Sequence, residues 1–540
     1  MYHHKASHDQ PFFLSYMTPD WLKFKRYPHI GKPLTKKKDA GWVTEYVTNP
    51  DKVASHKFTP LLHKIIHQRK YRPNKDAPKN KFGKKQRSVQ KPKKRPIFYA
   101  SHLDSILYSY YSHELTEAYE NYIENEDYGI SSVAYRKIPI VKGKKGNKSN
   151  IEFAFETFKF IEDNKHRKLS MIVSDVTSFF DNLNHRILHK QWKRILKTES
   201  LPDDHYNVYK SLISKRYVNE LELFKKFQHN LIVERGIEND GKNTRLRFKK
   251  VKHIWNLKRE RVVAYCSKED FYREAKNLIR VEKNCSHQHR RCRKSCQLKG
   301  IPQGTPMSAT LANIYMLDFD KTIFEGTQKK DAYYQRYSDD LIIVCDQKDE
   351  EYFYDLIRAT IEDLAKLDIQ RDKTNIYRYE DIDGEFVGGI LNEEQDISPN
   401  KHLEYLGFKY DGNKVKVKTV GFSKFYRSMK RAIRRGVHFA IKPENKNHDL
   451  FEERLFKRFT YKGAKRRLIY KPDPKSETGY SESKEQYWGN YISYLEKANR
   501  VMKPINGDDT IKKQYSKFWP NFGKEMKKAY KEIGEKVAKM

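Results

Sequence analysis

Residues 332–345 read AYYQRYSDDLIIVC, two short apolar runs on either side of the tetrapeptide Tyr337-Ser338-Asp339-Asp340. The runs are rich in aromatic and β-branched residues, which predicts a strand, a tight turn and a second strand. Two adjacent carboxylates in the turn of an apolar hairpin repel each other, and a divalent cation would neutralise them. Adjacent acids also occur in ordinary surface turns, because Asp is a good turn former. The pair alone leaves both interpretations open.

A third carboxylate, Asp175, ends another apolar run. Residues 169–175 read LSMIVSD, which predicts a buried strand, and polar capping residues in VTSFFDNLNH then precede a helix. A carboxylate at a strand end opposite an acidic hairpin turn supplies the hard oxygen ligands that Mg²⁺ prefers. Two-metal phosphoryl transfer needs such ligands, since one ion activates the attacking hydroxyl and the other neutralises the leaving group. We therefore predict that Asp175, Asp339 and Asp340 hold two Mg²⁺ ions, or Mn²⁺ in their place.

The charge of the chain points to a polyanionic partner. Lys and Arg total 109 of 540 residues against 70 Asp and Glu, a formal charge of +39. Such a chain gains free energy on nucleic acid, because each neutralised phosphate releases counterions. The 13% of aromatic residues suits stacking on unpaired bases and excludes a disordered tail protein. A merely soluble basic surface is the alternative.

The cysteine count and the hydropathy pattern bear on localisation. Five cysteines are too few for a secreted disulfide scaffold. We find neither a signal peptide in MYHHKASHDQPFFLSYM nor an apolar run of the ~18 residues that span a membrane. The expected location is a reducing cytoplasm, with no membrane partner.

The order of the expected elements predicts an α+β fold. Residues 101–125 and 351–367 have helical periodicity, whereas HLEYLGFKY and KVKVKTV alternate like a hairpin. The Pro- and Lys-rich stretch before Pro96 favours loop or extended structure. Strands and helices mix without a βαβ rhythm, which excludes a doubly wound sheet. The last hundred residues are basic, Tyr-rich and mostly helical in pattern.

Several motifs stand in a fixed order along the chain. They are Asp175 with Phe179-Phe180, GIPQGTPMSATLANIYM at 300–316, YSDD at 337–340, Lys373-Thr374, and Tyr405-Leu406-Gly407-Phe408. Their order and spacing resemble the palm motifs of reverse transcriptases, and KKRPI (93–97) and SSVAYRK (131–137) resemble fingers motifs. The resemblance covers roughly residues 90–412. It fits the bacterial branch best: retrons, group II intron proteins and defence-associated unknown-group enzymes.

The resemblance implies a right-hand polymerase. Residues 1–89 would form an N-terminal extension, 90–412 the fingers and an antiparallel palm sheet with helices, and 413–540 a basic helical thumb. The implied activity is RNA-directed DNA synthesis from dNTPs, in antiphage defence, on a dedicated non-coding RNA template. The alternatives are a retron or group II intron enzyme and an RNA-binding scaffold that no longer turns over. A second protein or a homo-oligomer is a further partner that the sequence leaves open.

Catalytic roles carry over to matching positions. Asp175 and Asp339 would bind both metals, Asp340 would assist, and the Val176 carbonyl would be a further ligand. Lys373 would stabilise or protonate the departing pyrophosphate. The bulky ring of Phe180, five residues after Asp175, would exclude the 2′-hydroxyl of ribonucleotides. Core packing is the alternative for Phe180.

Substrate-binding roles carry over in the same way. Gly304 would let the backbone approach the nucleotide, Gln303 would offer its amide, and Ser308 would cap the helix that follows. Lys94, Arg95 and Arg136 resemble fingers residues that grip the triphosphate, with a solvated basic loop as the alternative. The primer end would lie against residues at two hairpins, namely Tyr337, Tyr405, Leu406, Gly407 and Phe408.

The spacing between Asp175 and Gln303 exceeds what a palm needs, which predicts an insertion near residues 215–297. It contains CSHQHRRCRKSC, with Cys285, His287, His289, Cys292 and Cys296 as candidate zinc ligands. This spacing matches no standard zinc module, so a basic loop facing nucleic acid is favoured over zinc.

Overall fold

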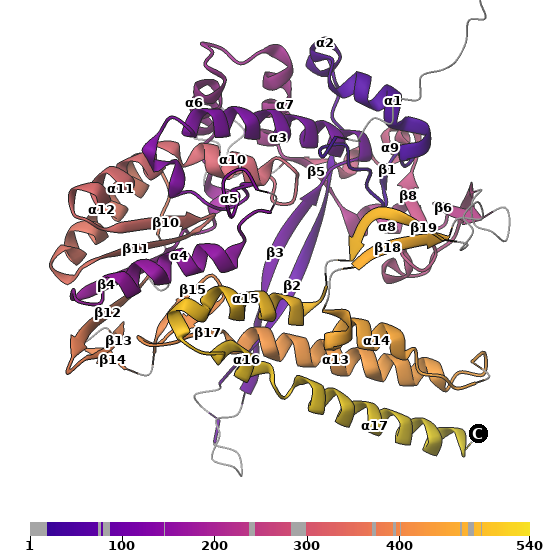
Figure 1. Ribbon diagram of the computed structural model, residues 1–540. Helices are drawn as coiled ribbons and strands as arrows, with labels where there is room; N and C mark the ends of the chain where they lie inside the picture. The colour runs from indigo at the N-terminus through magenta and orange to yellow at the C-terminus, as the bar shows by residue number, and fades with distance from the viewer. Residues whose placement is uncertain are drawn as a thin grey trace, which may run out of the picture. The chain divides into compact units, whose positions relative to one another are not determined.

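The computed structural model describes residues 19–539 apart from 74–76, 79–86, 145, 237–243, 282–298, 370–373, 393–395, 400, 446, 465–466, 473–479 and 488. The chain forms two compact units (Figure 1). The first comprises Met1–Gly129, Val176–Lys321 and Thr360–Asp368, and the second comprises Ile130–Asp175, Thr322–Ala359 and Ile369–Met540. Each unit is therefore assembled from three separate stretches of sequence.

The elements of the first unit come largely from the N-terminal half of the chain. Its helices are α1 (Lys36–Val47), α2 (Pro50–Ala54), α3 (His102–Ile123), α5 (Phe179–Asn182), α6 (His185–Leu196), α7 (Asp203–Ile213), α8 (Glu220–Phe227), α9 (Lys268–Glu274) and α10 (Ser308–Tyr315). Its strands are β1 (His29–Ile30), β2 (Leu61–Pro73), β3 (Arg87–Tyr99), β5 (Arg216–Asn219), β6 (Leu231–Gly236), β7 (Thr244–Lys249), β8 (Val262–Cys266) and β9 (Arg280–Val281).

The elements of the second unit come largely from the C-terminal half. Its helices are α4 (Asn150–Asp163), α13 (Thr419–Ala440), α14 (Glu452–Phe459), α15 (Tyr491–Asn506), α16 (Thr510–Tyr515) and α17 (Phe518–Val537), while α11 (Leu317–Lys329) and α12 (Glu350–Asp363) have residues in both units. Its strands are β4 (Leu169–Asp175), β10 (Tyr333–Tyr337), β11 (Asp340–Asp346), β12 (Asn375–Ile382), β13 (Glu385–Leu391), β14 (Ile397–Ser398), β15 (Leu403–Tyr405), β16 (Phe408–Tyr410), β17 (Val415–Val417), β18 (Arg467–Pro472) and β19 (Tyr480–Tyr487).

An antiparallel sheet organises the second unit. The described strands follow the order β10-β11-β4-β12-β13-β14, and every neighbouring pair is antiparallel. β4 lies inside the sheet with most of its side chains buried, as its apolar sequence predicts. α4 begins at a capping box of Ser149 and Glu152 and packs Phe158 into the same core as Met171.

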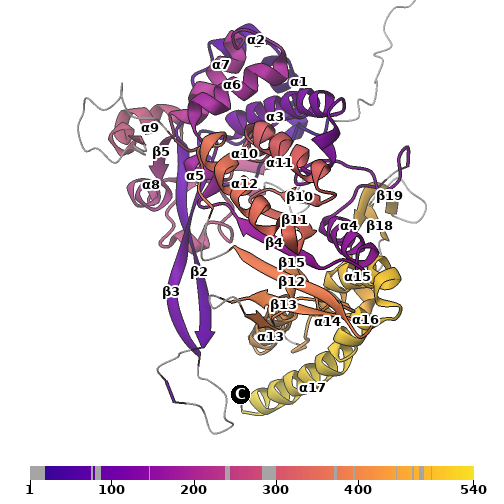
Figure 2. The same ribbon diagram turned by 90° about the vertical axis from the view of Figure 1, so that its left-hand side faces the viewer.

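Helices that follow the sheet in sequence complete this core (Figure 2). Met429 of α13, Leu495 of α15 and Phe522 of α17 are buried in one cluster with the sheet residues. Their outward faces carry the basic residues of this region, so amphipathic periodicity explains both the packing and the charge.

Two sheets and a group of helices make up the first unit. The described strands run in the orders β3-β2-β5-β9 and β1-β8-β6-β7. β2 and β3 form a long antiparallel pair (Figure 1), with Leu62 opposite Tyr99 at one end and Pro73 opposite Arg87 at the other. Leu62 and Tyr99 also join the hydrophobic core of this unit.

Most predicted elements are confirmed. The α+β class holds, α3 occupies the helical stretch 101–125, and β4, β10 and β11 occupy the predicted apolar strands. The extended structure predicted near Pro96 is the strand β3. The boundaries at residues 89 and 412 and the insertion at 215–297 stay predictions. Across the described residues, no helix has both the length and the apolar composition of a membrane span.

Candidate active site

The acidic hairpin consists of β10, the turn residues Ser338 and Asp339, and β11. Tyr337 pairs with Asp340 across the turn. Ser338 has φ 64° and a buried side chain. A left-handed conformation is uncommon for a residue with a Cβ, so surrounding contacts must hold it.

Arg336 supplies those contacts. Its side chain is fully buried, Nη1 donates to the Ser338 carbonyl at 2.9 Å, and Nη2 donates to Ser132 Oγ at 2.9 Å. The backbone N–H groups of Arg336 and Val133 donate to the carbonyls of Ser131 and Arg336 at 2.8 and 3.0 Å. The segment SSVAYRK therefore braces the hairpin, and Arg336 fixes the carbonyl that precedes Asp339.

The register of the sheet brings Asp175 to this turn. β4 and β11 are antiparallel, and Asp340 is the direct partner of Asp175. Asp175 and Asp339 are partly buried, whereas Asp340 is exposed. Residues directly opposite each other on antiparallel strands have Cβ atoms ~4.5–5.5 Å apart, and like charges there are destabilising. The three predicted carboxylates thus lie at the same end of the neighbouring strands β4 and β11.

These acids fit a magnesium site by their chemistry, because all offer hard oxygen ligands. Their side chains are not gathered into a closed cluster: within the described ranges, no three His, Cys, Asp or Glu side chains are grouped as a metal site. Val176, the proposed carbonyl ligand, is buried and belongs to the first unit. Lys373 lies outside the described residues, although its neighbour Thr374 has its hydroxyl 2.8 Å from that of Ser174.

Some of the predicted primer-binding residues are buried in the core, and others lie in a partly exposed turn. Tyr405 and Phe408 are buried, and the Tyr405 hydroxyl donates to Gln335 Oε1 at 3.1 Å. Leu406 and Gly407 form the turn between them, both with positive φ (42° and 93°), and are partly exposed. Burial of the ring raises the pKa of Tyr405 well above its usual value. Primer binding at these positions stays a prediction, and the turn is the part that solvent reaches.

Tyr337 lies just before the acidic turn and is half-buried. Its pKa is raised by burial first, then by the neighbouring Tyr135 and Asp340. Arg136 donates through Nη1 to the Ser132 carbonyl at 2.7 Å. It therefore takes part in the same brace that Arg336 uses, and its proposed contact with a triphosphate is untested.

Other predicted residues meet in the first unit at the loop 300–304. The Ile301 N–H donates to the Phe180 carbonyl at 2.9 Å, and the Phe98 N–H donates to the Gln303 carbonyl at 2.9 Å. Gly304 has φ +114°, and a Cβ there would lie 2.7 Å from the Phe98 carbonyl oxygen. The loop therefore requires glycine, and it links the segment of Phe180 to β3.

Lys94 and Arg95 lie on β3, both exposed, a few residues before Phe98. The strand rises ~3.3 Å per residue, so Arg95 is ~10 Å along it from Phe98. Phe180 is partly buried beside Phe179, their ring centroids 5.4 Å apart. These residues share one unit, and their contact with a nucleotide is untested.

The capping prediction for Ser308 is wrong. α10 begins at Ser308 itself, no side chain caps it, and the Ser308 hydroxyl donates to the Pro302 carbonyl at 2.7 Å. Ser308 is the first residue of the helix and Met307 occupies the capping position, so the Ser308 hydroxyl donates to the preceding loop and does not accept from the first-turn N–H groups. The candidate zinc ligands Cys285, His287, His289, Cys292 and Cys296 lie outside the described residues.

The sequence reasoning missed Arg336 and Ser132. An arginine inside the apolar strand YYQRY was a usable signal, because a buried guanidinium needs hydrogen-bond acceptors around it. Ser132 gave no comparable signal, since its role depends on a contact 204 positions away in the chain.

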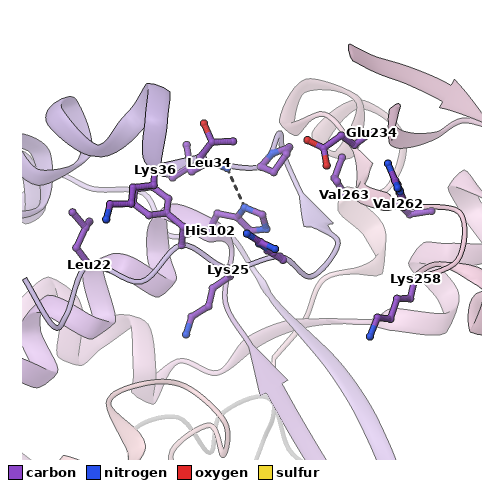
Figure 3. Close-up of a pocket in the computed structure, with 14 residues that line it drawn as sticks. Leu22, Lys25, Leu34, Lys36, His102, Glu234, Lys258, Val262 and Val263 are labelled. Carbon is purple, nitrogen blue, oxygen red and sulfur yellow. Dashed lines mark hydrogen bonds between the residues drawn. The ribbon is translucent and has the colours of Figure 1, made fainter. Parts of the chain in front are cut away.

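The first unit also contains a basic cavity of about 660 Å³ for which the sequence made no prediction. Figure 3 shows residues from the N-terminal segment on one side and from β6 to β8 on the other, among them Leu22, Lys25, Leu34, Lys36, Glu234, Lys258, Val262 and Val263. At its wall, His102 Nδ1 accepts from the Leu34 N–H at 3.1 Å, and its Nε2 is 2.9 Å from the Tyr27 carbonyl. Both ring nitrogens contact backbone groups, so we interpret His102 as a structural residue that holds the N-terminal segment against α3.

A family model described as reverse transcriptase (RNA-dependent DNA polymerase) matches residues 200–410. The matched range includes Gln303, Asp339 and Asp340, and Asp175 precedes it. No curated protein matches the chain.

Among solved structures, the chain is similar to two yeast telomerases. Apo telomerase from Candida tropicalis, truncated from its C-terminal domain, is 12% identical over 67% of this chain and 59% of that one, with a TM-score of 0.32. Telomerase from Candida albicans in complex with a fragment of telomeric RNA is 12% identical over 92% and 67%, with a TM-score of 0.33. The chain thus spans about three fifths of the length of the first telomerase. With scores this low, the family match alone carries the assignment. Residues 200–410 therefore match the reverse transcriptase (RNA-dependent DNA polymerase) family, and the helices and antiparallel sheets of the chain are consistent with a right-hand polymerase fold.

Proposed function

We propose that the protein is an RNA-directed DNA polymerase whose chemistry takes place at Asp175, Asp339 and Asp340. One observation carries the proposal: Asp340 is the direct strand partner of Asp175, next to Asp339 in a turn that Arg336 fixes. Like charges at directly opposed strand positions cost stability unless cations neutralise them. Binding of Mg²⁺, or Mn²⁺ in its place, would offset that cost.

The roles of the chain's own groups follow from their chemistry. Two divalent ions, when bound, would lower the pKa of the primer 3′-hydroxyl and neutralise the leaving pyrophosphate. The carboxylates of Asp175 and Asp339 would hold and orient both ions, with Asp340 and the Val176 carbonyl completing the ligand set. Lys373 would donate a proton to the departing pyrophosphate or stabilise its charge.

Substrate selection is assigned to the residues that resemble fingers and palm positions. Phe180 would exclude the ribonucleotide 2′-hydroxyl by volume, Gly304 would admit the nucleotide close to the backbone, and Gln303 would offer its amide. Lys94, Arg95 and Arg136 would contact the triphosphate. The primer end would rest on Tyr337 and on the turn 405–408.

The biological role is the broadest part of the proposal. The formal charge of +39 and the RNA-dependent family support a dedicated non-coding RNA as template, with dNTPs as substrates and DNA as product. We place this activity in bacterial antiphage defence, in the cytoplasm. Retron or group II intron membership, a second protein, and a homo-oligomer would each be revealed by what co-purifies.

A synthesis assay tests the proposal. The full chain, purified with its bound RNA, receives Mg²⁺ and labelled dNTPs or rNTPs, in parallel with Asp339→Asn. Asp383→Asn is the matched control, because Asp383 is exposed in a loop with φ 53°, a conformation that Asn also favours. Loss of one charged ligand should reduce deoxynucleotide incorporation by about two to three orders of magnitude.

The outcomes separate the alternatives. Incorporation of dNTPs by the parent and Asp383→Asn, but not by Asp339→Asn, supports the polymerase, and sequencing its product identifies the template. Incorporation of rNTPs but not dNTPs would indicate that the protein synthesises RNA and would contradict the proposed DNA synthesis. Bound RNA without incorporation in any of the three proteins would favour a scaffold.

A further inference from the structure

A small pocket lies between α13 and α14 in the second unit, well outside the residues matched by the family model. Its volume is about 280 Å³, close to the ~300 Å³ lower end of small-molecule sites. Its lining includes Arg435, Gly436 and Phe439 from α13, Phe451 just before α14, and Arg454 and Arg458 from α14. We call this the α13–α14 pocket.

Two aromatic rings of the pocket are open to solvent. Phe439 is 44% exposed and Phe451 is 66% exposed. Exposed Phe rings cost free energy in water, which is recovered when a flat apolar group stacks on them. Lys442 Nζ lies over the Phe439 ring, 5.2 Å from its centroid, so one face of that ring already carries a cation and the Phe451 ring is the freer stacking surface.

Three guanidinium groups share the lining with these rings. Arg435 sits one helical turn from Phe439 on α13, and Arg454 and Arg458 sit one turn apart on α14. Within the described residues, none of the three pairs with a carboxylate. Three uncompensated planar cations attract an anion, and arginine suits phosphate because its fork donates two parallel hydrogen bonds.

Gly436 leaves the floor of the pocket open. A Cβ there would meet the Leu450 side chain at 3.5 Å, an ordinary contact, so alanine can be placed at this position without a clash. Glycine in a helix interior costs about 0.8–1.0 kcal/mol relative to alanine, so the position gives up helix stability for space. That space is what a flat ligand group would occupy.

We propose that the α13–α14 pocket binds one unpaired nucleotide of a single-stranded nucleic acid. The base stacks between or against Phe439 and Phe451, and the adjoining phosphates meet Arg435, Arg454 and Arg458. Inside a duplex, the flat faces of each base are covered by the stacked bases above and below it. A duplex would therefore offer its phosphates to this surface but no base face to the Phe rings. The rings therefore favour a single strand, and this binding is independent of polymerase turnover.

A binding assay on the full chain, without divalent ions or nucleotides, separates this site from catalysis. The probes are a fluorescent 12-nucleotide oligouridine RNA, the corresponding oligothymidine DNA, and a blunt RNA duplex with the same number of phosphates. Arg435→Ala is compared with Arg434→Ala, its neighbour on the same helix that is exposed but does not line the pocket. Both variants remove one charge, so only the lining position should show the extra loss.

We expect Phe451→Ala to weaken single-strand binding ~5- to 100-fold, as the loss of a base-stacking contact does, with Phe451→Tyr restoring it. Arg435→Ala should weaken single-strand binding more than Arg434→Ala does, because it removes a direct phosphate contact. Arg434→Ala should cost no more than a general surface charge, and duplex binding should change equally in both arginine variants. The RNA and DNA single strands identify which nucleic acid the pocket prefers.

Occlusion provides a second test that does not alter charge. Gly436→Ala and Gly436→Leu improve helix propensity, so thermal unfolding should be unchanged or raised. Single-strand affinity should fall from the parent to Gly436→Ala to Gly436→Leu. Parent-like affinity in a folded Gly436→Leu protein, or equal losses for Arg434→Ala and Arg435→Ala, would overturn the proposal. Asp339→Asn should bind the single strand like the parent, which keeps this result separate from the polymerase assay.

Discussion

Replacing Arg336 with lysine should loosen the acidic hairpin without changing its charge. Arg336 reaches two acceptors at once, the Ser338 carbonyl and Ser132 Oγ, each at 2.9 Å and each buried. A lysine ammonium at that depth can reach one of them at most, so one charge-assisted hydrogen bond is lost and one buried acceptor is left unsatisfied. A hydrogen bond of this kind contributes ~1.5–3 kcal/mol. We expect the hairpin to lose ~2–3 kcal/mol of local stability.

Native-state amide exchange measures that loss where it occurs. A change of ~2–3 kcal/mol in opening free energy should speed exchange of the β10 and β11 amides ~30- to 150-fold. Arg427→Lys on the exposed face of α13, whose Nε donates to the Ser423 carbonyl, is the control and should leave those amides unchanged. DNA synthesis by Arg336→Lys should also need more Mg²⁺, because the carbonyl that sets the direction of Asp339 is less fixed. Exchange at the parent rate in the hairpin would refute the bracing role of Arg336.

Three further predictions follow from single positions. Gly304→Ala should lower the free energy of unfolding by about 2 kcal/mol or more, because it combines φ +114° with a Cβ 2.7 Å from a carbonyl oxygen. Gly143→Ala is the control in the same denaturation series: with φ +78° and open space around the Cβ, it should show the backbone strain alone. Phe180→Ala should admit ribonucleotides ~10- to 100-fold better in competition assays, and a variant that keeps the parent's dNTP preference would contradict the steric role. Burial lowers the pKa of His29 from 6.5 to about 4, so the unfolded chain takes up a proton first and stability is lost as the pH falls from 6.5 towards 4. His29→Gln should flatten that part of the stability profile by about 3 kcal/mol, and parallel profiles would exclude His29 as its cause.

The strands that carry the acids could be predicted because their composition is local. LSMIVSD and the runs around Asp339 contain enough apolar and β-branched residues to identify buried strands without any neighbour. Their pairing could not be predicted in the same way. Nothing in the residues around Asp175 encodes that β4 lies between β11 and β12, since that order depends on the energy of the whole sheet.

Local sequence patterns did not predict contacts between residues that are brought together only by the fold. The sequence predicts that Ser308 caps a helix, yet its hydroxyl donates a hydrogen bond to the Pro302 carbonyl in the preceding loop. Tyr405 is a predicted primer-binding residue, and nothing in the sequence indicated that its ring is inside the core. The α13–α14 pocket joins residues from two helices, and the space between them becomes apparent only when both are placed. Sequence reasoning therefore predicted the strands of the candidate site better than the contacts that hold them together.

The central place of β4 in its sheet has a consequence for biosynthesis. Asp175 leaves the ribosome 165 residues before its strand partner Asp340, and residues up to Ile382 are needed before β12 can cover the other edge. At ~5–20 residues per second, the apolar strand waits roughly 10–30 s with both edges unpaired. Unpaired apolar edges join other chains readily, so the nascent chain is exposed to aggregation during this interval. Faster translation or early chaperone binding should therefore raise the soluble yield of this protein more than stabilising the finished fold would.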